Sequence, residues 1–354
     1  MYPLKGKRVL ITGGTGSLGQ VLVRRLLSGE MGQPAKIVVF SRDEAKQHAM
    51  RVAYLHQHAV TDEVIYHNFR ELLEFRIGDV RDFHSVASAL RGADVVFNAA
   101  ALKQVPTCEY FPYEAVTTNI GGPENIVRAI QEHEMPVETV IGISTDKACK
   151  PVNVMGMTKA IQERVFIQAN MRCQNTRFVC VRYGNVLASR GSVIPLFHEQ
   201  IRGGGPVTIT TTDMTRFLLS LDQAVDTVFA ALSEARRGET YIPRVPSALV
   251  VDIAESLIGE RPIKTEVTGI RPGEKVHEIL VSEEECHRTV DRGKHYAILP
   301  MLLELRDGQA APEALASEYS SADDVMKRES LDQLLIDHRL TLDDAAGDEA
   351  ELLR

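Results

Sequence analysis

Eight residues near the N-terminus decide the fold: Thr12-Gly13-Gly14-Thr15-Gly16-Ser17-Leu18-Gly19. They follow a short β-branched run at residues 8–12 and precede residues 20–27, whose apolar side chains recur at helical spacing. A glycine-rich turn between a strand and a helix lets the backbone approach a pyrophosphate, and the start of the helix offers free N–H groups to the phosphates. The stretch therefore predicts a dinucleotide site with Gly13, Thr15, Gly16, Ser17, Leu18 and Gly19 as contacts.

The alternation of strand and helix continues along the first half of the chain. Strands are expected at 36–40, 73–77, 94–98, 139–144 and 178–183, and helices at 43–57, 86–90, 122–132 and 153–171. Parallel strands need crossover helices, so this order predicts an α/β fold with a doubly wound parallel sheet and right-handed crossovers. We expect residues 1–185 to form this Rossmann-like domain.

Beyond residue 185 the alternation loosens. Gly203-Gly204-Gly205-Pro206 marks a loop, a short strand is expected at 207–210, and helices are expected at 221–233 and 251–258. We interpret residues 186–305 as a smaller C-terminal substrate lobe that is interleaved with the first domain. Residues 306–354 form an acidic tail, with one helix expected at 331–336.

Composition excludes several classes of function. The 354 residues carry a net charge of -8 and no basic run, which argues against a nucleic-acid partner. No apolar stretch approaches the length of a membrane span, and the N-terminus lacks the pattern of a signal peptide. Five scattered cysteines predict neither a disulfide framework nor a metal site. We expect a cytoplasmic protein with reduced thiols and without a bound metal.

Residues at the ends of the second, third and fourth strands are expected to contact the cofactor, and those after the second strand indicate which dinucleotide binds. Ser41 and Arg42 suit a ribose 2′-phosphate and favour NADP, whereas Asp43 keeps NAD possible. After the third strand, Asp79 and Val80 are placed to reach the adenine. After the fourth, the small side chains of three consecutive alanines let a cofactor lie close to the backbone; these are Ala99, Ala100 and Ala101.

Several motifs resemble one enzyme family. They are Ser144-Thr145-Asp146-Lys147-Ala148, Gly156 with Thr158 and Lys159, Arg182-Tyr183-Gly184-Asn185-Val186, Arg190-Gly191-Ser192-Val193 and Gly269-Ile270-Arg271-Pro272-Gly273-Glu274-Lys275. Together they resemble the soluble branch of the UDP-N-acetylglucosamine 4,6-dehydratases of polysaccharide biosynthesis, members of the extended short-chain dehydrogenase/reductase superfamily. The resemblance covers residues 8 to about 300 and implies a lyase that acts on a UDP-sugar. It also implies a homo-oligomer.

One position departs from the superfamily pattern. A tyrosine normally stands four residues before the helix lysine, but here Met155 precedes Lys159. A thioether cannot accept a proton from a sugar hydroxyl. Membrane-bound members of the family look similar at this position, and the resemblance implies that Thr145 handles the hydroxyl instead.

The reaction itself assigns the remaining roles. Oxidation at sugar C4 acidifies the C5 proton, loss of the C6 hydroxyl gives an enone, and the stored hydride returns to C6. We expect Lys147 to take the C5 proton and Asp146 to protonate the leaving oxygen. These roles require a lowered lysine pKa and a raised aspartate pKa. Lys159 is expected to hold the nicotinamide ribose.

Substrate contacts are expected mainly in the second lobe. Arginine suits a diphosphate, and Arg216 and Arg271 match family positions that resemble UDP contacts. The other expected contacts line the path of the sugar and diphosphate: Lys103, Met155, Asn185, Ser192, Val193 and Glu274.

Two other readings of the sequence stay open. A nucleotide-sugar epimerase on the same fold also begins by oxidising C4, but it does not need the pair Asp146 and Lys147. A catalytically silent NADP-binding protein is the second alternative, motivated by Met155. Within the dehydratase reading, the sequence leaves retention or inversion at C5 undecided.

Overall fold

The computed structural model describes residues 2–56, 69–187, 192–306 and 313–342. Its largest sheet has nine strands within these residues, in the order β13-β14-β9-β6-β5-β4-β1-β2-β3. They are β1 (Arg8–Thr12), β2 (Lys36–Ser41), β3 (Leu73–Ile77), β4 (Val95–Asn98), β5 (Thr139–Ile143), β6 (Arg177–Val181), β9 (Thr240–Pro243), β13 (Thr289–Arg292) and β14 (His295–Ile298). Strands β1 to β6 and β9 run parallel, and β14 and β13 close the sheet antiparallel. The doubly wound α/β prediction is confirmed.

Helices cover both faces of this sheet. They are α1 (Ser17–Leu27), α2 (Glu44–His56), α4 (Phe83–Leu90), α5 (Val105–Tyr110), α6 (Pro112–Val116), the π-helix η2 (Thr117–Gly121), α7 (Gly122–Glu132), α8 (Val154–Arg172) and α10 (Leu221–Glu234). Alternate residues of each strand point to opposite faces. Thus Val9 and Ile11 pack with α1 and α10, whereas Leu10 packs with α4, α7 and α8.

The expected elements of the first half are found with small shifts at their ends. The helix expected at 86–90 begins earlier, at Phe83, because the Asp82 side chain accepts from the N–H groups of His84 and Ser85 and caps it. The strand expected to end at residue 144 ends at Ile143, and Ser144 starts the turn that follows. Gln57, the expected end of the second helix, lies outside the described residues.

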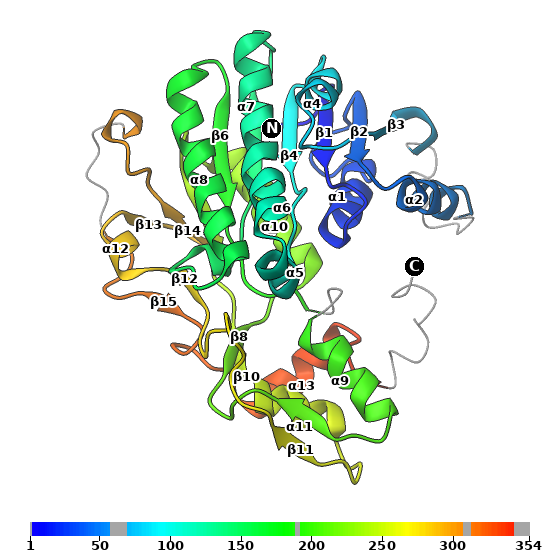
Figure 1. Cartoon of the computed structure of the whole chain (residues 1–354), viewed down its shortest axis with the longest axis vertical. Coiled ribbons are helices and arrows are strands. Elements are labelled where there is room, and N and C mark those ends of the chain that lie inside the picture. Colours follow the sequence, from blue (N-terminus) through cyan, green and yellow to red (C-terminus); the bar gives the residue numbers. More distant parts are fainter. Residues whose placement is uncertain (1, 57–68, 188–191, 307–312, 343–354) are drawn as a thin grey trace.

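The segments beyond residue 185 build a second packing unit and also extend the sheet. The second unit contains α9 (Val193–Arg202), β7 (Val207–Ile209), β8 (Thr215–Phe217), β10 (Ser247–Leu249), α11 (Val250–Ile258), β11 (Thr265–Val267) and α13 (Arg328–Asp337), which lie together in the lower part of Figure 1. Nearer the sheet lie β12 (Ile279–Val281), α12 (Glu283–Cys286), η4 (Leu303–Leu305) and β15 (Tyr319–Ser320).

The helix expected in the acidic tail belongs to the core of the second unit. Its Leu331 and Leu335 are buried against Phe197 of α9 and Ile253 of α11. The helix is longer than expected, running from Arg328 to Asp337. Burial of its apolar face, rather than local helix propensity, stabilises such a short helix.

The sheet order sets the place of a ligand. The strand order reverses between β1 and β4, whose chain connections run to opposite sides. In open α/β sheets, ligands bind at the carboxyl ends of the strands beside such a reversal. The turns after β1, β4 and β5 therefore form the candidate site.

Candidate active site

The glycine-rich turn after β1 has no room for side chains where the sequence places glycine. Gly13 has φ +68°, and a Cβ there would lie 2.7 Å from the backbone nitrogen of Ala100. A Cβ on Gly19 would lie 2.5 Å from Cα of Gly14. Gly16 begins α1 without a side-chain cap, which leaves the first N–H groups of this helix for another acceptor. These features fit a dinucleotide pyrophosphate, the group that the turn predicts.

The ends of β2 and β3 bring Arg42 and Asp79 together. The two side chains are 3.9 Å apart at Nη1 and Oδ2, and the Arg42 side chain is 58% exposed. Burial alone would raise the pKa of Asp79, but hydrogen bonds from Arg81 outweigh it and hold that pKa below its ordinary value. Ser41 is buried, and its hydroxyl accepts from Gln47. This corner thus presents two arginines around one carboxylate.

The segment after β4 is held by a residue that the sequence analysis missed. Asn119, in the π-helix η2, bonds both the N–H and the carbonyl of Leu102 and donates to Thr158. It fixes the chain directly after Ala99, Ala100 and Ala101. No apolar periodicity marks Asn119, so its role is visible only once η2 lies against α8. Val80, after β3, is buried against Gly122.

The turn after β5 carries the first catalytic candidates. It forms the short 3₁₀ helix η3 (Asp146–Ala148), which Thr145 caps by accepting from the N–H of Lys147. The Thr145 hydroxyl donates to Oδ1 of Asp146 at 2.8 Å. Asp146 is fully buried, and its Oδ2 has no hydrogen-bond partner. One carboxylate oxygen is therefore bonded while the other is free inside the site.

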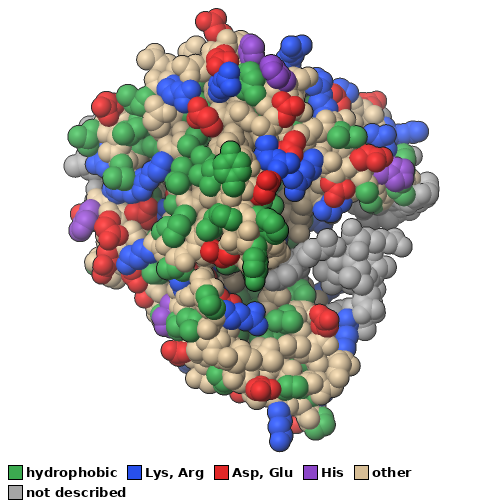
Figure 2. All heavy atoms as spheres, viewed as in Figure 1, with side chains coloured by type: hydrophobic (Ala, Val, Ile, Leu, Met, Phe, Trp, Pro, Cys, Tyr) green, Lys and Arg blue, Asp and Glu red, His purple; other side chains and the backbone are tan. Residues whose placement is uncertain are grey.

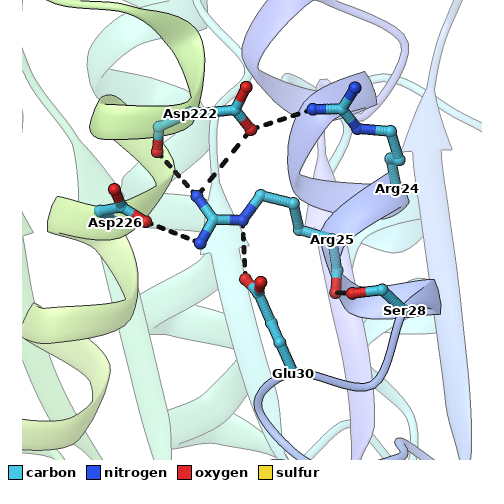
Figure 3. Close-up of a pocket in the computed structure, with 6 residues that line it drawn as sticks. All are labelled: Arg24, Arg25, Ser28, Glu30, Asp222 and Asp226. Carbon is cyan, nitrogen blue, oxygen red and sulfur yellow. Dashed lines mark hydrogen bonds and ion pairs between the residues drawn. The ribbon is translucent and has the colours of Figure 1, made fainter.

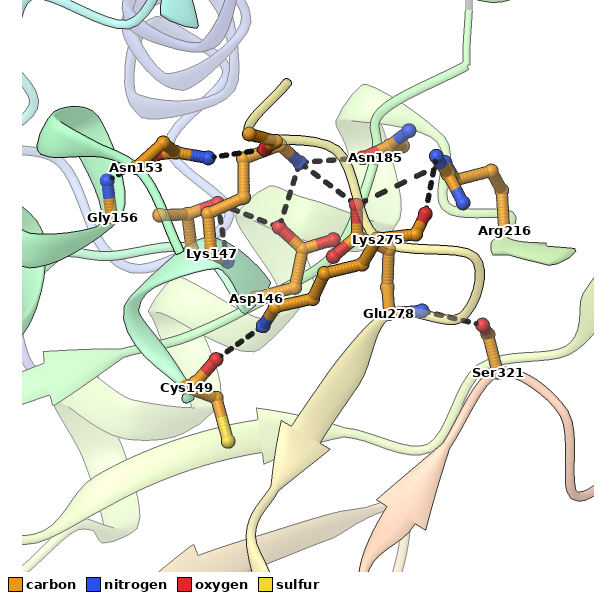
Figure 4. Close-up of polar contacts among 12 residues, drawn as sticks. Asp146, Lys147, Cys149, Asn153, Gly156, Asn185, Arg216, Lys275, Glu278 and Ser321 are labelled. Carbon is orange, nitrogen blue, oxygen red and sulfur yellow. Dashed lines mark hydrogen bonds and ion pairs between the residues drawn. The ribbon is translucent and has the colours of Figure 1, made fainter. Parts of the chain in front are cut away.

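Lys147 lies among three oxygens (Figure 4). Its Nζ is 3.1 Å from Oδ1 of Asp146, 3.1 Å from Oδ1 of Asn185 and 3.5 Å from Oε1 of Glu278. Burial disfavours the ammonium, but the carboxylates of Asp146 and Glu278 outweigh burial and raise the pKa of Lys147. The expectation of a lowered lysine pKa is therefore wrong for this arrangement, because Asp146 and then Glu278 stabilise the ammonium more than burial destabilises it.

Lys159 and Met155 sit on the buried side of α8. The Lys159 ammonium donates to the carbonyl oxygen of Ile143 and to Oε1 of Gln162, each at 2.5 Å. Burial lowers the pKa of Lys159 to about 8. Met155 packs in an apolar cluster with Cys108 and Ala115. In this structure Lys159 supports the end of β5, and its expected contact with the nicotinamide ribose stays a prediction.

Four of the residues expected to contact substrate lie in two places. Arg216 on β8 is buried near the turn after β5 and donates to the carbonyls of Thr215, Lys275 and Val276. Arg271 is exposed on a turn whose backbone N–H donates to Glu274. Arg216 and Asn185 thus both reach the cluster around Lys147, the first through Glu278 and the second directly, whereas Arg271 and Glu274 share one turn.

Three further expected contacts lie at the edges of the site. Lys103 is exposed after β4, and Ser192 and Val193 start α9, where the buried Ser192 hydroxyl oxygen has no partner among the described atoms. Arg190 and Gly191, which belong to the same sequence motif, lie outside the described residues.

A buried ion cluster, which the sequence analysis also missed, joins the end of β6 to α8 and to the segment around β12. Arg182 makes paired hydrogen bonds to the carboxylates of Glu163 on α8 and Glu285 on α12. Glu163 also accepts from the Ser144 hydroxyl, next to the catalytic turn. Arg182 stood within a quoted motif, but only the fold shows that its partners come from two distant helices.

A second hollow lies away from the turn after β5. A hollow between α1 and α10 is lined by Arg24, Arg25, Ser28, Glu30, Asp222 and Asp226, whose charges pair with one another (Figure 3). Within the described part of the chain, no cluster of three or more His, Cys, Asp or Glu side chains could hold a metal. Among the same residues, no helix is both long and apolar enough to cross a membrane.

Comparison with known proteins adds sequence and structural relatives. A protein named UDP-glucose 4-epimerase from Rickettsia canadensis is 44% identical over 297 residues, which are 82% of each chain. The crystal structure of Pen from Bacillus thuringiensis is 34% identical, with a TM-score of 0.83 over 95% of this chain and 99% of that chain.

A more distant relative shares the fold alone. The dTDP-glucose 4,6-dehydratase DesIV from Streptomyces venezuelae, solved with NAD and TYD bound, is 21% identical, with a TM-score of 0.62 over 76% of this chain and 86% of that chain. The family model described as "Polysaccharide biosynthesis protein" matches residues 9–300. With most of its length matched, the chain belongs to the polysaccharide biosynthesis protein family.

Proposed function

We propose that the protein is an NADP-dependent dehydratase that converts UDP-N-acetylglucosamine to a UDP-4-keto-6-deoxy sugar. One observation carries this proposal: the contact between Asp146 and Lys147 at the carboxyl end of β5. Elimination across C5 and C6 needs one group that takes a proton and one that gives a proton. Two adjacent groups of opposite charge, at the same sheet edge as the dinucleotide turn, provide both.

The cofactor would be held by the turn after β1 and by the ends of β2 to β4. The α1 N-terminus would bind the pyrophosphate, and Arg42 would bind the 2′-phosphate of NADP. When bound, the nicotinamide supplies a reversible hydride acceptor for C4 and C6. Because the Arg42 side chain is mostly exposed and open to a ligand, the preference for NADP over NAD is tested by comparing the affinities of both for the protein and for Arg42→Ala.

The acid–base groups start in the wrong protonation states for the elimination and must exchange one proton. The raised pKa of Lys147 favours its ammonium form beside Asp146. Transfer of one proton along the 3.1 Å contact breaks an N–H bond and forms an O–H bond, which gives a neutral amine and a carboxylic acid. The amine then takes the C5 proton, and the acid protonates the leaving C6 hydroxyl.

Thr145 is the group proposed for the C4 hydroxyl. Its own hydroxyl donates to Oδ1 of Asp146 at 2.8 Å, which leaves its oxygen able to accept the hydrogen of the C4 hydroxyl. Because Asp146 takes its one proton from Lys147, the C4 proton would leave to water. Met155 has no such group, and its side chain is buried among apolar residues.

A 4-epimerase is the second candidate, and the name of the Rickettsia canadensis relative favours it. An epimerase would oxidise C4 and return the hydride to the same carbon, which keeps the C6 hydroxyl. Loss of that hydroxyl therefore separates the two functions.

Proton NMR of the protein with NADP and UDP-N-acetylglucosamine in D₂O tests the proposal. A new C6 methyl signal with deuterium at C5 is expected, and the C5 configuration of the product distinguishes retention from inversion. Conversion of the substrate to its C4 epimer with the C6 hydroxyl retained supports the epimerase. Bound NADP without turnover of either UDP-N-acetylglucosamine or UDP-glucose supports a silent binding protein.

A homodimer is also proposed. Exposed apolar side chains gather where α5, α6 and α8 lie side by side, in the middle of the face shown in Figure 2; they are Tyr110, Phe111, Tyr113, Met157 and Ile161. Such a patch is typical of an interface between protein chains. Light scattering is expected to give twice the mass of one chain, and Tyr113→Glu is expected to give a monomer.

A further inference from the structure

Glu278 is a buried carboxylate that the fold brings into the catalytic cluster from the second half of the chain. It directly precedes β12, and its backbone is fixed on both sides by Ser321: its N–H donates to the Ser321 hydroxyl, and its carbonyl accepts from the Ser321 N–H (Figure 4). Its side chain is 4% exposed. The carboxylate therefore has a fixed position beside Lys147.

The contacts of Glu278 differ from those of the neighbouring buried glutamates. Glu163 and Glu285 each use both carboxylate oxygens in hydrogen bonds to Arg182. Glu278 places Oε1 3.5 Å from Nζ of Lys147 and 3.9 Å from Nε of Arg216, and its Oε2 has no partner. A buried carboxylate oxygen without a partner lowers stability. Fold stability alone therefore does not account for Glu278.

Four charged groups face Lys147 from three segments. Asp146 belongs to η3, Glu278 and Lys275 belong to the segment before β12, and Arg216 belongs to β8. Lys275 is bound to the carbonyl of Cys149 at the end of the catalytic turn, and Arg216 is bound to the carbonyls of the same segment as Glu278. Within this cluster, Glu278 supplies the only negative charge that does not come from the catalytic turn itself.

We propose that Glu278 is a positioning residue: its carboxylate holds the Lys147 ammonium from the second half of the chain and sets how readily that ammonium gives its proton to Asp146. The inference rests on the proposed function, in which Lys147 must become neutral before it can act at C5. A second carboxylate at 3.5 Å opposes that step, because it stabilises the charged lysine. Removal of the carboxylate charge should therefore make the neutral lysine available at lower pH.

The test reads the titration of Lys147 directly, so it does not depend on which reaction the enzyme catalyses. The protein is labelled with carbon-13 at lysine Cε, and Lys147→Met assigns the Lys147 resonance. In Glu278→Gln the midpoint of the Lys147 titration is expected to fall by about one pH unit or more, since a carboxylate at this distance is a strong local charge. If the neutral lysine is needed for turnover, kcat increases with pH as Lys147 loses its proton. The midpoint of this increase should move to lower pH by the same amount.

Glu239→Gln is the matched control. Glu239 is equally buried and is paired with Arg292 at 3.0 Å, away from the catalytic cluster. This variant removes a buried carboxylate without touching Lys147, so the Lys147 titration should stay at its wild-type midpoint. A loss of kcat at every pH in Glu278→Gln, with an unmoved Lys147 titration, would show a merely structural role and overturn the inference.

Glu278→Asp keeps the test decisive if Glu278→Gln does not fold. The shorter side chain withdraws the carboxylate from Lys147, so a partial fall of the midpoint is expected, and an unmoved midpoint overturns the inference. Failure of the proposed function is seen separately. If the Lys147 titration shifts but no C6 methyl product forms, Glu278 still acts on Lys147, and the proposed dehydratase function is wrong.

Discussion

The two lysines near the carboxyl end of β5 have opposite environments. Lys147, on the turn after the strand, lies between the carboxylates of Asp146 and Glu278, which raise its pKa against the effect of burial. Lys159, on α8, donates to the neutral oxygens of Ile143 and Gln162, and burial outweighs the charge of the nearby Glu163 and lowers the pKa of Lys159 to about 8. The charge of the partners, rather than depth alone, thus decides the protonation of a buried lysine.

The largest effect, on kcat, is expected from replacement of Asp146, the carboxylate next to Lys147. Asp146→Asn cannot give a proton to the leaving oxygen, so kcat should fall by roughly 10²–10⁴-fold while NADP still binds. The midpoint of the Lys147 titration should also fall, because one carboxylate is lost. The C6 methyl signal and a fluorescence titration with NADP measure the two properties. Near-full turnover of this variant would break the assigned role of Asp146.

A smaller effect is expected from Lys159, on the pH dependence of the free energy of unfolding. The pKa of Lys159 is about 8 in the folded protein and 10.5 in the unfolded chain, so the unfolded chain binds more protons between these values. Below pH 8 the folded protein carries a penalty on the order of 3 kcal/mol from this group, and the penalty disappears as pH rises to 10.5. The free energy of unfolding of the wild type, minus that of Lys159→Met, should rise across this window.

Lys147→Met provides a flat comparison over the same pH range. A raised folded pKa contributes stability that is fully present below the unfolded value of 10.5 and is lost as pH rises through the folded pKa. The wild-type minus Lys147→Met difference should therefore not rise between pH 8 and 10.5. Urea unfolding of the three proteins across this range measures both slopes, and equal slopes would remove the contrast between the two lysines.

The smallest effect is expected from the neutral partner of Lys147. Asn185→Ala removes one hydrogen-bond acceptor of the ammonium but no charge. One such bond contributes on the order of 1 kcal/mol, so kcat should fall by about fivefold. The Lys147 titration should hardly move. A displacement as large as that in Asp146→Asn would mean that hydrogen bonding, and not charge, governs this lysine.

The first half of the fold could be predicted because its signals are local. The run from Thr12 to Gly19 contains strand end, turn and helix start, and the structure forms this turn with Gly13 at φ +68°. The strand expected at 73–77 and the helix expected at 122–132 have the predicted bounds. Alternation with a period of two or of 3.6 residues needs no knowledge of distant segments.

The second half was harder to predict from sequence, because its short strands form only by pairing with strands far along the chain. Thr215–Phe217 is a strand because it pairs with Ser247–Leu249. Three later strands, β9, β14 and β13, extend the first sheet, although their sequences carry no sign of which sheet they join. Pairing of this kind depends on tertiary packing, which overrides local propensity.

The sequence by itself determined the dinucleotide turn, the parallel sheet and the grouping of Thr145, Asp146 and Lys147, because neighbours in the chain stay neighbours in a turn. Only the tertiary structure placed a second carboxylate, that of Glu278 from a distant segment, beside Lys147. It likewise buried Lys159 beside carbonyl and amide oxygens. Electrostatic energies depend on distances through space and on burial, and neither is written in the spacing of residues along a chain.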